Sequence, residues 1–268
     1  MTEPTETEPV TEAARTGAAG TGAAARNGTP IVFVHGTRLT GAMWRSQLDA
    51  LESSPAVAID LPGHGRRAGT AFTLAGAADA VADAIDSLGG SAIVVGLSLG
   101  GYVAMDLARR APGRVAGLVL AGATQEPVGL RALPYRGLAR VLGVADERRL
   151  AALNEWFFRT RYPAAIAGPI IADGFWYRGG ADALRALVGE RFVPRLAAYR
   201  GPVLLINGSL DVLFRMGEPA FLGVARHGRR RVLRGATHLS NLDRPRAFTA
   251  AVRDFAAEIS GGPSGTSA

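Results

Sequence analysis

The sequence contains neither cysteine nor lysine. Without cysteine there are no disulfide bonds and no thiol nucleophile, but the compartment stays open, because a reduced enzyme can simply lack the residue. All 30 basic residues are therefore arginine, and the formal charge is +7. Acidic residues are interspersed among them, the densest basic cluster is only 229–231, and no aromatic stacking platform accompanies it. Nucleic acid is not expected as a partner.

Long apolar runs are also missing. No uninterrupted apolar segment reaches transmembrane length, and the acidic amino terminus lacks the basic start and apolar segment of a signal peptide. We therefore expect a cytoplasmic protein with no membrane partner. Residues 1–28 and 261–268 contain too few large apolar side chains to bury surface and order themselves. These two segments are predicted to be disordered tails.

Between the tails, short apolar runs alternate with segments of helical period, in a chain that is 48% hydrophobic. This alternation predicts an α/β fold, with a mostly parallel twisted sheet flanked by helices. The expected strands are 31–34, 57–59, 92–95, 115–120, 203–206 and 231–233, and the expected helices are 42–51, 74–88, 99–111, 216–226 and 245–259.

The interval 127–200 contains no convincing strand, only amphipathic helical stretches. A helical insertion of this length fits as a lid over the carboxyl edge of the sheet, where open α/β folds bind ligands. The interval holds ten of the eighteen aromatic residues and twelve arginines against six acidic residues. We expect Trp156, Phe157 and Trp176 to contact an apolar, anionic substrate. Packing within the lid and an ordinary solvated surface are the alternatives.

The stretch "VVGLSLGG" at 94–101 places one serine between glycines, where an apolar strand turns into a helix. Such a turn holds a side chain up in the crevice only if its neighbours two residues away are very small, and Gly96 and Gly100 meet that need. An incidental serine in a small-residue turn is the alternative. We take Ser98 as the candidate nucleophile.

A serine hydroxyl needs a base to take its proton and an acid to orient that base. Among the four histidines, His238 follows the last expected strand and precedes the final helix, so it is the candidate base. Asp211 leaves the preceding strand at the same edge of the sheet and is the candidate acid. Glu126, which follows the strand before the insertion, is the rival.

The negative charge that develops on a tetrahedral intermediate needs backbone donors already in place. Leu99, at the start of the helix after Ser98, supplies one amide. Thr37, in the turn "VHGTRLTG" after the first strand, supplies the other. Arg38, in the same turn, is a candidate to bind a substrate carboxylate. His35 is expected to hold the turn rather than to take part in chemistry.

With these segments identified, the chain resembles the α/β-hydrolase superfamily from Thr29 to Ser260. The motifs "VFVHGT", "DLPGHG", "GLSLGG", "INGSLD" and "GATHLSNLDRP" occur in family order, and "HGTRLTGAMW" and "THLSNLDRPRAF" look most like the enol-lactonase and small carboxylesterase branch. The resemblance implies Ser98, His238 and Asp211 as a catalytic triad. It also implies the Thr37 and Leu99 amides as the oxyanion hole. It also implies a catalytic core at 29–124 and 200–260, with a helical cap at 125–199.

The expected function is that of a serine hydrolase that cleaves a small-molecule carboxylic ester or lactone through an acyl-enzyme. No metal ligand set is visible in the sequence, and no cofactor is expected. A thioesterase or a carbon–carbon bond hydrolase uses the same residues and stays open. Two further alternatives are a biosynthetic cyclase that transfers its acyl group to an internal hydroxyl and a ligand-binding protein with negligible turnover. Serine at position 98, where haloalkane dehalogenases of this fold carry aspartate, counts against their chemistry.

Overall fold

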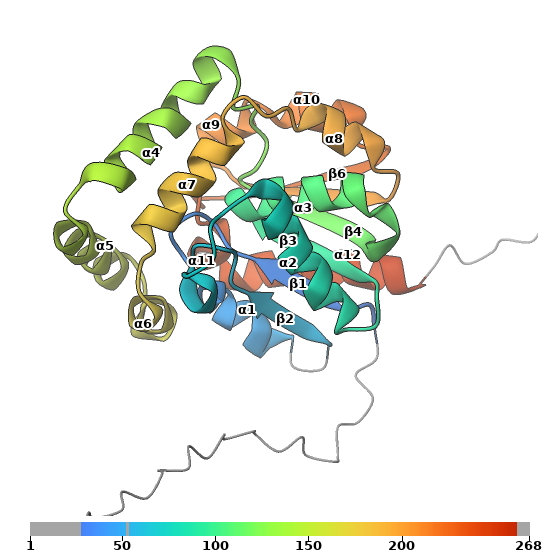
Figure 1. Cartoon of the computed structure of the whole chain (residues 1–268). Helices are drawn as coiled ribbons and strands as arrows, with labels where there is room; N and C mark the ends of the chain where they lie inside the picture. Colours follow the sequence, from blue (N-terminus) through green and yellow to red (C-terminus); the bar gives the residue numbers. More distant parts are fainter. Residues whose placement is uncertain (1–27, 52–53, 262–268) are drawn as a thin grey trace, which may run out of the picture.

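The structure is a computed structural model that describes residues 28–51 and 54–261. The predicted tails lie outside the described residues, apart from Gly28 and from Gly261, which is the last residue of the final helix. The described residues form one parallel sheet with strand order β2-β1-β3-β4-β5-β6 (Figure 1). The strands are β1 (Ile31–Val34), β2 (Ala56–Ile59), β3 (Ala92–Leu97), β4 (Val115–Ala121), β5 (Pro202–Gly208) and β6 (His227–Leu233).

Alternate residues of each strand point to opposite faces of the sheet, as the two-residue period of a strand requires. Val32 and Val94 lie in one buried cluster, with helices α2 (Leu74–Asp86) and α3 (Leu99–Arg110). Phe33 and Val95 lie in the other, with α1 (Arg45–Ala50) and α12 (Pro245–Gly261). Since helices cover both faces, the strands other than β6 read as nearly continuous apolar runs, and this explains why the sequence located them.

Three expected elements differ from the structure. The helix expected at 42–51 is a 3-10 turn η1 (Gly41–Trp44) followed by α1, and Thr40 caps it by accepting a hydrogen bond from the Ala42 amide. The helix expected at 216–226 is shorter, α10 (Glu218–Val224), with Pro219 in its first turn, where a missing amide is tolerated. Strand β6 begins at His227, four residues earlier than expected, because its polar first half pairs with β5 at the edge of the sheet.

The interval 127–200 is helical, as expected. Its elements are the 3-10 turn η4 (Gly129–Ala132), α4 (Leu133–Val144), α5 (Glu147–Arg161), α6 (Ala164–Asp173), α7 (Tyr177–Leu187) and α8 (Val193–Ala198). Helix α4 packs along α7, and α5 packs on α6. Figure 1 shows α4 to α7 gathered at one end of the molecule, beside the short helices α9 (Val212–Arg215) and α11 (Ser240–Asp243). Helix α8 packs instead on α3 and α10, beside the sheet.

Within residues 28–51 and 54–261, no helix combines the length and the apolar character that crossing a bilayer requires.

Candidate active site

Ser98 lies in a strained turn between β3 and α3. Its φ of 53° and ψ of −113° place a residue other than glycine in a region that L-amino acids rarely adopt. The flanking glycines permit this turn. A Cβ at Gly96 would lie 2.3 Å from the carbonyl carbon of Gly100, and a Cβ at Gly100 would lie 2.2 Å from the carbonyl oxygen of Val34. The sequence pattern around Ser98 therefore reflects a steric requirement.

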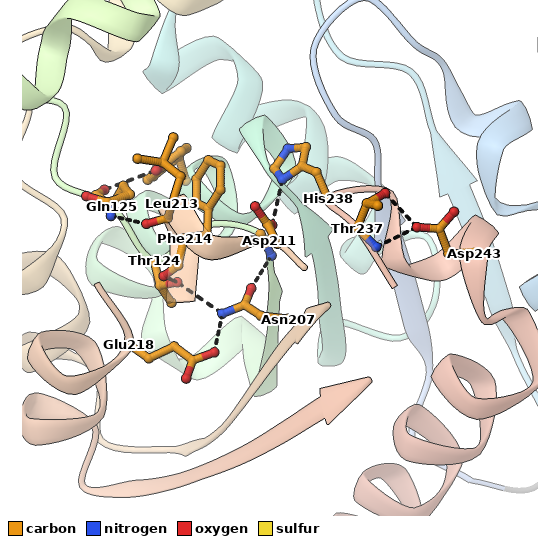
Figure 2. Close-up of polar contacts among 12 residues, drawn as sticks. Thr124, Gln125, Asn207, Asp211, Leu213, Phe214, Glu218, Thr237, His238 and Asp243 are labelled. Carbon is orange, nitrogen blue, oxygen red and sulfur yellow. Dashed lines mark hydrogen bonds and ion pairs between the residues drawn. The ribbon is translucent and has the colours of Figure 1, made fainter. Parts of the chain in front are cut away.

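His238 stands on the loop between β6 and α11, and its ring is held on three sides. Nδ1 lies 2.9 Å from Oδ2 of Asp211, so with the proton on Nδ1 the ring donates to that carboxylate (Figure 2). Phe214 stacks on the ring with centroids 4.6 Å apart. Gly122, with φ of 54°, lies against the ring, and a Cβ there would be 2.7 Å from Cε1. The remaining nitrogen, Nε2, is thereby left as the ring's proton acceptor.

Asp211 is buried at the start of α9, with its side chain 8% exposed. Asn207, near the end of β5, links the end of β4 to helix α10 beside Asp211. Its Oδ1 accepts from the Gly122 amide at 2.8 Å, and its Nδ2 donates to Glu218 at 2.8 Å (Figure 2). Glu126, the rival acid, is occupied elsewhere, because its carboxylate accepts the Phe192 and Val193 amides at the start of α8. Of the two acids, only Asp211 contacts the His238 ring.

Ser98 and His238 both lie against the carboxyl end of β4. The Ser98 amide donates to the carbonyl of Ala121 at 2.7 Å, and the next residue, Gly122, contacts the His238 ring. In the described part of the chain, Ser98 Oγ has no hydrogen bond to His238 or to any other protein atom. Catalytic contacts often tighten only when substrate binds.

Two backbone amides without an acceptor among the described residues lie next to residues of the Ser98 turn, on different elements. Leu99 is the first residue of α3, so its N–H points out of the positive end of that helix. Thr37 lies in the turn after β1. The preceding residue, Gly36, is so close to Ser98 that a Cβ on Gly36 would lie 3.7 Å from the Cβ of Ser98. Among the described residues neither amide has a protein acceptor. This is the arrangement expected of an oxyanion hole.

His35 and His64 brace the Thr37 turn as neutral rings. His35 accepts the Leu61 amide on Nε2 at 2.9 Å, and His64 accepts the Arg38 amide on Nε2 at 3.2 Å. In each case Nδ1–H donates to a nearby backbone carbonyl. Burial, followed by the charge of His64, lowers the pKa of His35 to about 3, and burial likewise lowers the pKa of His64. The sequence-based expectation that His35 is structural agrees with these contacts.

The expected substrate-contacting residues occupy different places. Arg38 reaches from the turn into the cap, where its Nε donates to Oδ1 of Asn154 at 3.2 Å. Trp176 lines a cavity of about 540 Å³ between the cap and the loop at 63–72, but neither Ser98, Asp211 nor His238 lines it. Trp156, on α5, is 62% exposed and does not line this cavity. Phe157 packs edge-on against Phe158.

The sequence reasoning missed Asp243, which joins the His238 loop to the cap. Its Oδ2 accepts the amide and the hydroxyl of Thr237, both at 2.6 Å (Figure 2). Its Oδ1 accepts from Tyr162 at 3.0 Å and from Arg161 at 2.9 Å, at the end of α5. Burial acts to raise the pKa of Asp243, but these hydrogen bonds outweigh it and the pKa is lowered. In the sequence, the signal for this role of Asp243 was its position five residues after His238.

Metal chemistry has no visible support among the side chains. Within residues 28–51 and 54–261, no group of three or more His, Asp or Glu side chains is arranged as ligands would be. What the site offers instead is a serine in a strained turn, an imidazole fixed by a carboxylate, and two free amides.

A parallel sheet with a serine elbow and an Asp–His pair at its carboxyl edge defines the class of α/β serine hydrolases. Residues 31–252 match the alpha/beta hydrolase family, so the chain belongs to that family, and the predicted resemblance is confirmed.

Curated relatives narrow the class to ester hydrolysis. The chain is 32% identical over 245 residues to the pimeloyl-[acyl-carrier protein] methyl ester esterase of Neisseria meningitidis, covering 84% of this chain and 92% of that protein. It is 39% identical over 216 residues to the protein of that name from Aromatoleum aromaticum, covering 73% and 85%. The enol-lactonase of Burkholderia xenovorans superposes with a TM-score of 0.72 at 25% identity, covering 87% and 92%. The protein is an ester-cleaving serine hydrolase.

Proposed function

We propose that Ser98, His238 and Asp211 cleave a carboxylic ester or lactone through an acyl-enzyme. The observation that carries the proposal is the 2.9 Å contact between His238 Nδ1 and Asp211 Oδ2. That contact fixes the tautomer that leaves Nε2 free to accept the Ser98 proton. The alternative acid, Glu126, is bound to amides of α8.

The proposed reaction has two halves. Ser98 Oγ attacks the carbonyl carbon as its proton passes to His238 Nε2, and the oxyanion is held by the Thr37 and Leu99 amides. The imidazolium then gives its proton to the leaving alcohol, and the ester bond breaks. In the second half, water attacks the acyl-enzyme with His238 as base, which releases the acid and restores Ser98. Asp211 keeps the imidazole oriented and stabilises its positive charge throughout.

The direct test is covalent labelling with a fluorophosphonate, followed by peptide mass mapping and by turnover of p-nitrophenyl esters. We expect the label on Ser98, and a loss of turnover of roughly 10⁴- to 10⁶-fold in Ser98→Ala. Asp211→Asn should cost about 10⁴-fold because it permits the wrong tautomer. The matched control is Glu126→Gln, which removes the carboxylate that accepts the first amides of α8. This variant should leave the rate of ester turnover largely intact. Labelling elsewhere, with an active alanine variant, refutes the proposal.

A second candidate substrate is an ester attached to an acidic carrier protein, since the relatives above are named for one. A surface formed by η4, α4 and the start of α5 favours it, because exposed apolar and basic side chains are interspersed there. None of these arginines forms an ion pair with a described residue, whereas Arg159 and Arg178 nearby do. The residues are Leu130, Arg131, Leu133, Arg136, Arg140, Val141, Val144, Arg148 and Arg149.

Carrier recognition is tested with one methyl ester presented on an acyl carrier protein or on free pantetheine. If this surface docks the carrier, kcat/KM is higher for the carrier-bound ester than for the pantetheine ester. The double variant Arg136→Glu and Arg140→Glu then lowers kcat/KM for the carrier-bound ester alone. Salt screens the attraction between opposite charges, so added salt should also lower kcat/KM for the carrier-bound ester alone. The control is Arg246→Glu on α12, an exposed arginine away from this face. Equal rates for the two forms exclude this candidate.

A further inference from the structure

Arg38 is a half-buried charged side chain that reaches from the turn after β1 to helix α5. It follows Thr37 directly, and its own φ of 57° turns the chain at this point. The backbone is fixed on both sides, because its amide donates to His64 and its carbonyl accepts from the Trp176 amide at 2.9 Å. The side chain therefore leaves from a rigid position next to the proposed oxyanion hole.

The guanidinium group is held in the cap by one neutral contact. Arg38 Nε donates to Asn154 Oδ1 at 3.2 Å, and Asn154 Nδ2 donates to the Leu150 carbonyl at 2.8 Å and to the Tyr177 hydroxyl at 3.1 Å. Because both donors of the Asn154 amide are used on other partners, its oxygen is turned toward Arg38. Asn154 thus orients the guanidinium without neutralising its charge.

No described carboxylate pairs with Arg38. The acidic groups on the surrounding elements are bound to other partners. Asp60 accepts from Arg66 and from the Gly41 amide, Asp173 accepts from the Thr40 hydroxyl, and Glu147 pairs with Arg178. Charges removed from water are costly unless they are paired, so a half-buried guanidinium without a counter-ion gains by pairing with an anion.

Side-chain donors of Arg38 and of Trp176 lack acceptors among the described residues. Nη1 and Nη2 of Arg38 donate to no described residue, and neither is fully buried. The indole Nε1 of Trp176, whose backbone amide is bonded to Arg38, is buried without an acceptor. Burial also lowers the pKa of Arg38, yet a guanidinium keeps its charge at neutral pH. The Nη1 and Nη2 groups of Arg38 are therefore available to donate to an oxyanion.

We propose that Arg38 binds a carboxylate on the acyl part of the substrate, so that the preferred substrates are half-esters or lactones of dicarboxylic acids. The inference rests on the hydrolase function proposed above and names its substrate class. A carrier-bound methyl ester has no such carboxylate near its ester carbonyl. The two substrate candidates therefore give opposite results at Arg38.

The test compares mono-p-nitrophenyl glutarate with p-nitrophenyl valerate, a neutral ester of similar length. We expect a higher kcat/KM for the charged ester. Arg38→Gln should lower the ratio of the two kcat/KM values by about 10- to 100-fold, as expected when a charge-assisted hydrogen-bonded pair is removed. Asn154→Asp leaves Arg38 in place but supplies an internal carboxylate, so it should lower the same ratio. Arg246→Gln, an equal change of charge on α12, should not.

A binding measurement keeps this inference separate from the proposed function. Glutarate should raise the Tm of the wild type and of Ser98→Ala, and should fail to raise that of Arg38→Gln. If esters are cleaved and Ser98 is labelled, but the ratio is the same in Arg38→Gln, the inference is wrong and the proposed function stands. If glutarate stabilises only chains with Arg38 but no ester is cleaved, the proposed function is wrong and the anion site stands.

Discussion

At the scale of single residues, the site depends on positions where no side chain fits. Gly96 and Gly100 allow the backbone of Ser98 to turn, and this requirement is readable from the sequence because it falls on immediate neighbours. Gly122 is different. It makes room for the ring of His238, which is more than a hundred residues further along the chain. A local pattern cannot reveal such a requirement, and the sequence analysis assigned Gly122 no role.

Gly122→Ala is expected to reduce kcat/KM by about 10- to 100-fold, because a misplacement of the reacting groups by about 1 Å has effects of this size. The new Cβ would fall 2.7 Å from Cε1 of His238, and alanine is strained at the φ of 54° found there. Ester turnover and the rate of fluorophosphonate labelling are the measurements. Gly113→Ala is the control, since a Cβ there meets nothing within 4 Å. Equal rates for the two variants would show that the ring tolerates the contact.

At the scale of elements, most strands and the helical character of the interval 127–200 could be predicted, and the side-chain contacts between elements could not. Buried parallel strands give apolar runs, and the insertion is marked by the absence of any. The acid of the pair stayed open between Asp211 and Glu126, because both follow strands at the same edge. Only the fold shows that Glu126 caps α8. The same holds for Asp243, whose partners Tyr162 and Arg161 are about eighty residues away in the chain.

Asp243→Ala should lower the free energy of unfolding by about 1–3 kcal/mol, because it leaves buried donors of Thr237 and Tyr162 without an acceptor. It should also lower kcat, since Thr237 precedes His238 on the same loop. Urea denaturation and ester turnover measure the two effects. Asp254→Ala is a suitable control, because Asp254 is exposed and its contact with Arg231 is 3.9 Å long. Full stability in Asp243→Ala would mean that the loop is held by other contacts.

At the scale of the whole molecule, two histidines are enclosed in neutral form within a fold that also buries Asp60. Burial lowers the pKa of His35 from 6.5 to about 3, so the unfolded chain takes up a proton that the folded chain refuses in this range. Stability from this group is complete above pH 6.5 and is lost as the pH falls toward 3. The lowered pKa of His64 acts in the same direction.

The free energy of unfolding should therefore fall with pH below 6.5, by up to about 1.4 kcal/mol per pH unit for each of the two histidines. Urea denaturation between about pH 7 and about pH 5 measures the slope. His35→Gln keeps an acceptor for the Leu61 amide but does not titrate, so its slope should be shallower. A slope that matches the wild type would show that other groups control the pH dependence.

The cap and the core touch through bare backbone at one point, where a Cβ at Gly179 would lie 1.9 Å from the carbonyl oxygen of Gly63. Helix α7 can approach the loop after β2 this closely only because both positions are glycine. A chimera that grafts the helical interval of a relative onto this core keeps Gly63, and it therefore needs glycine at the position of Gly179. Any larger residue there would push α7 away from the loop after β2, and the range of substrate shapes that fit would change together with the rate.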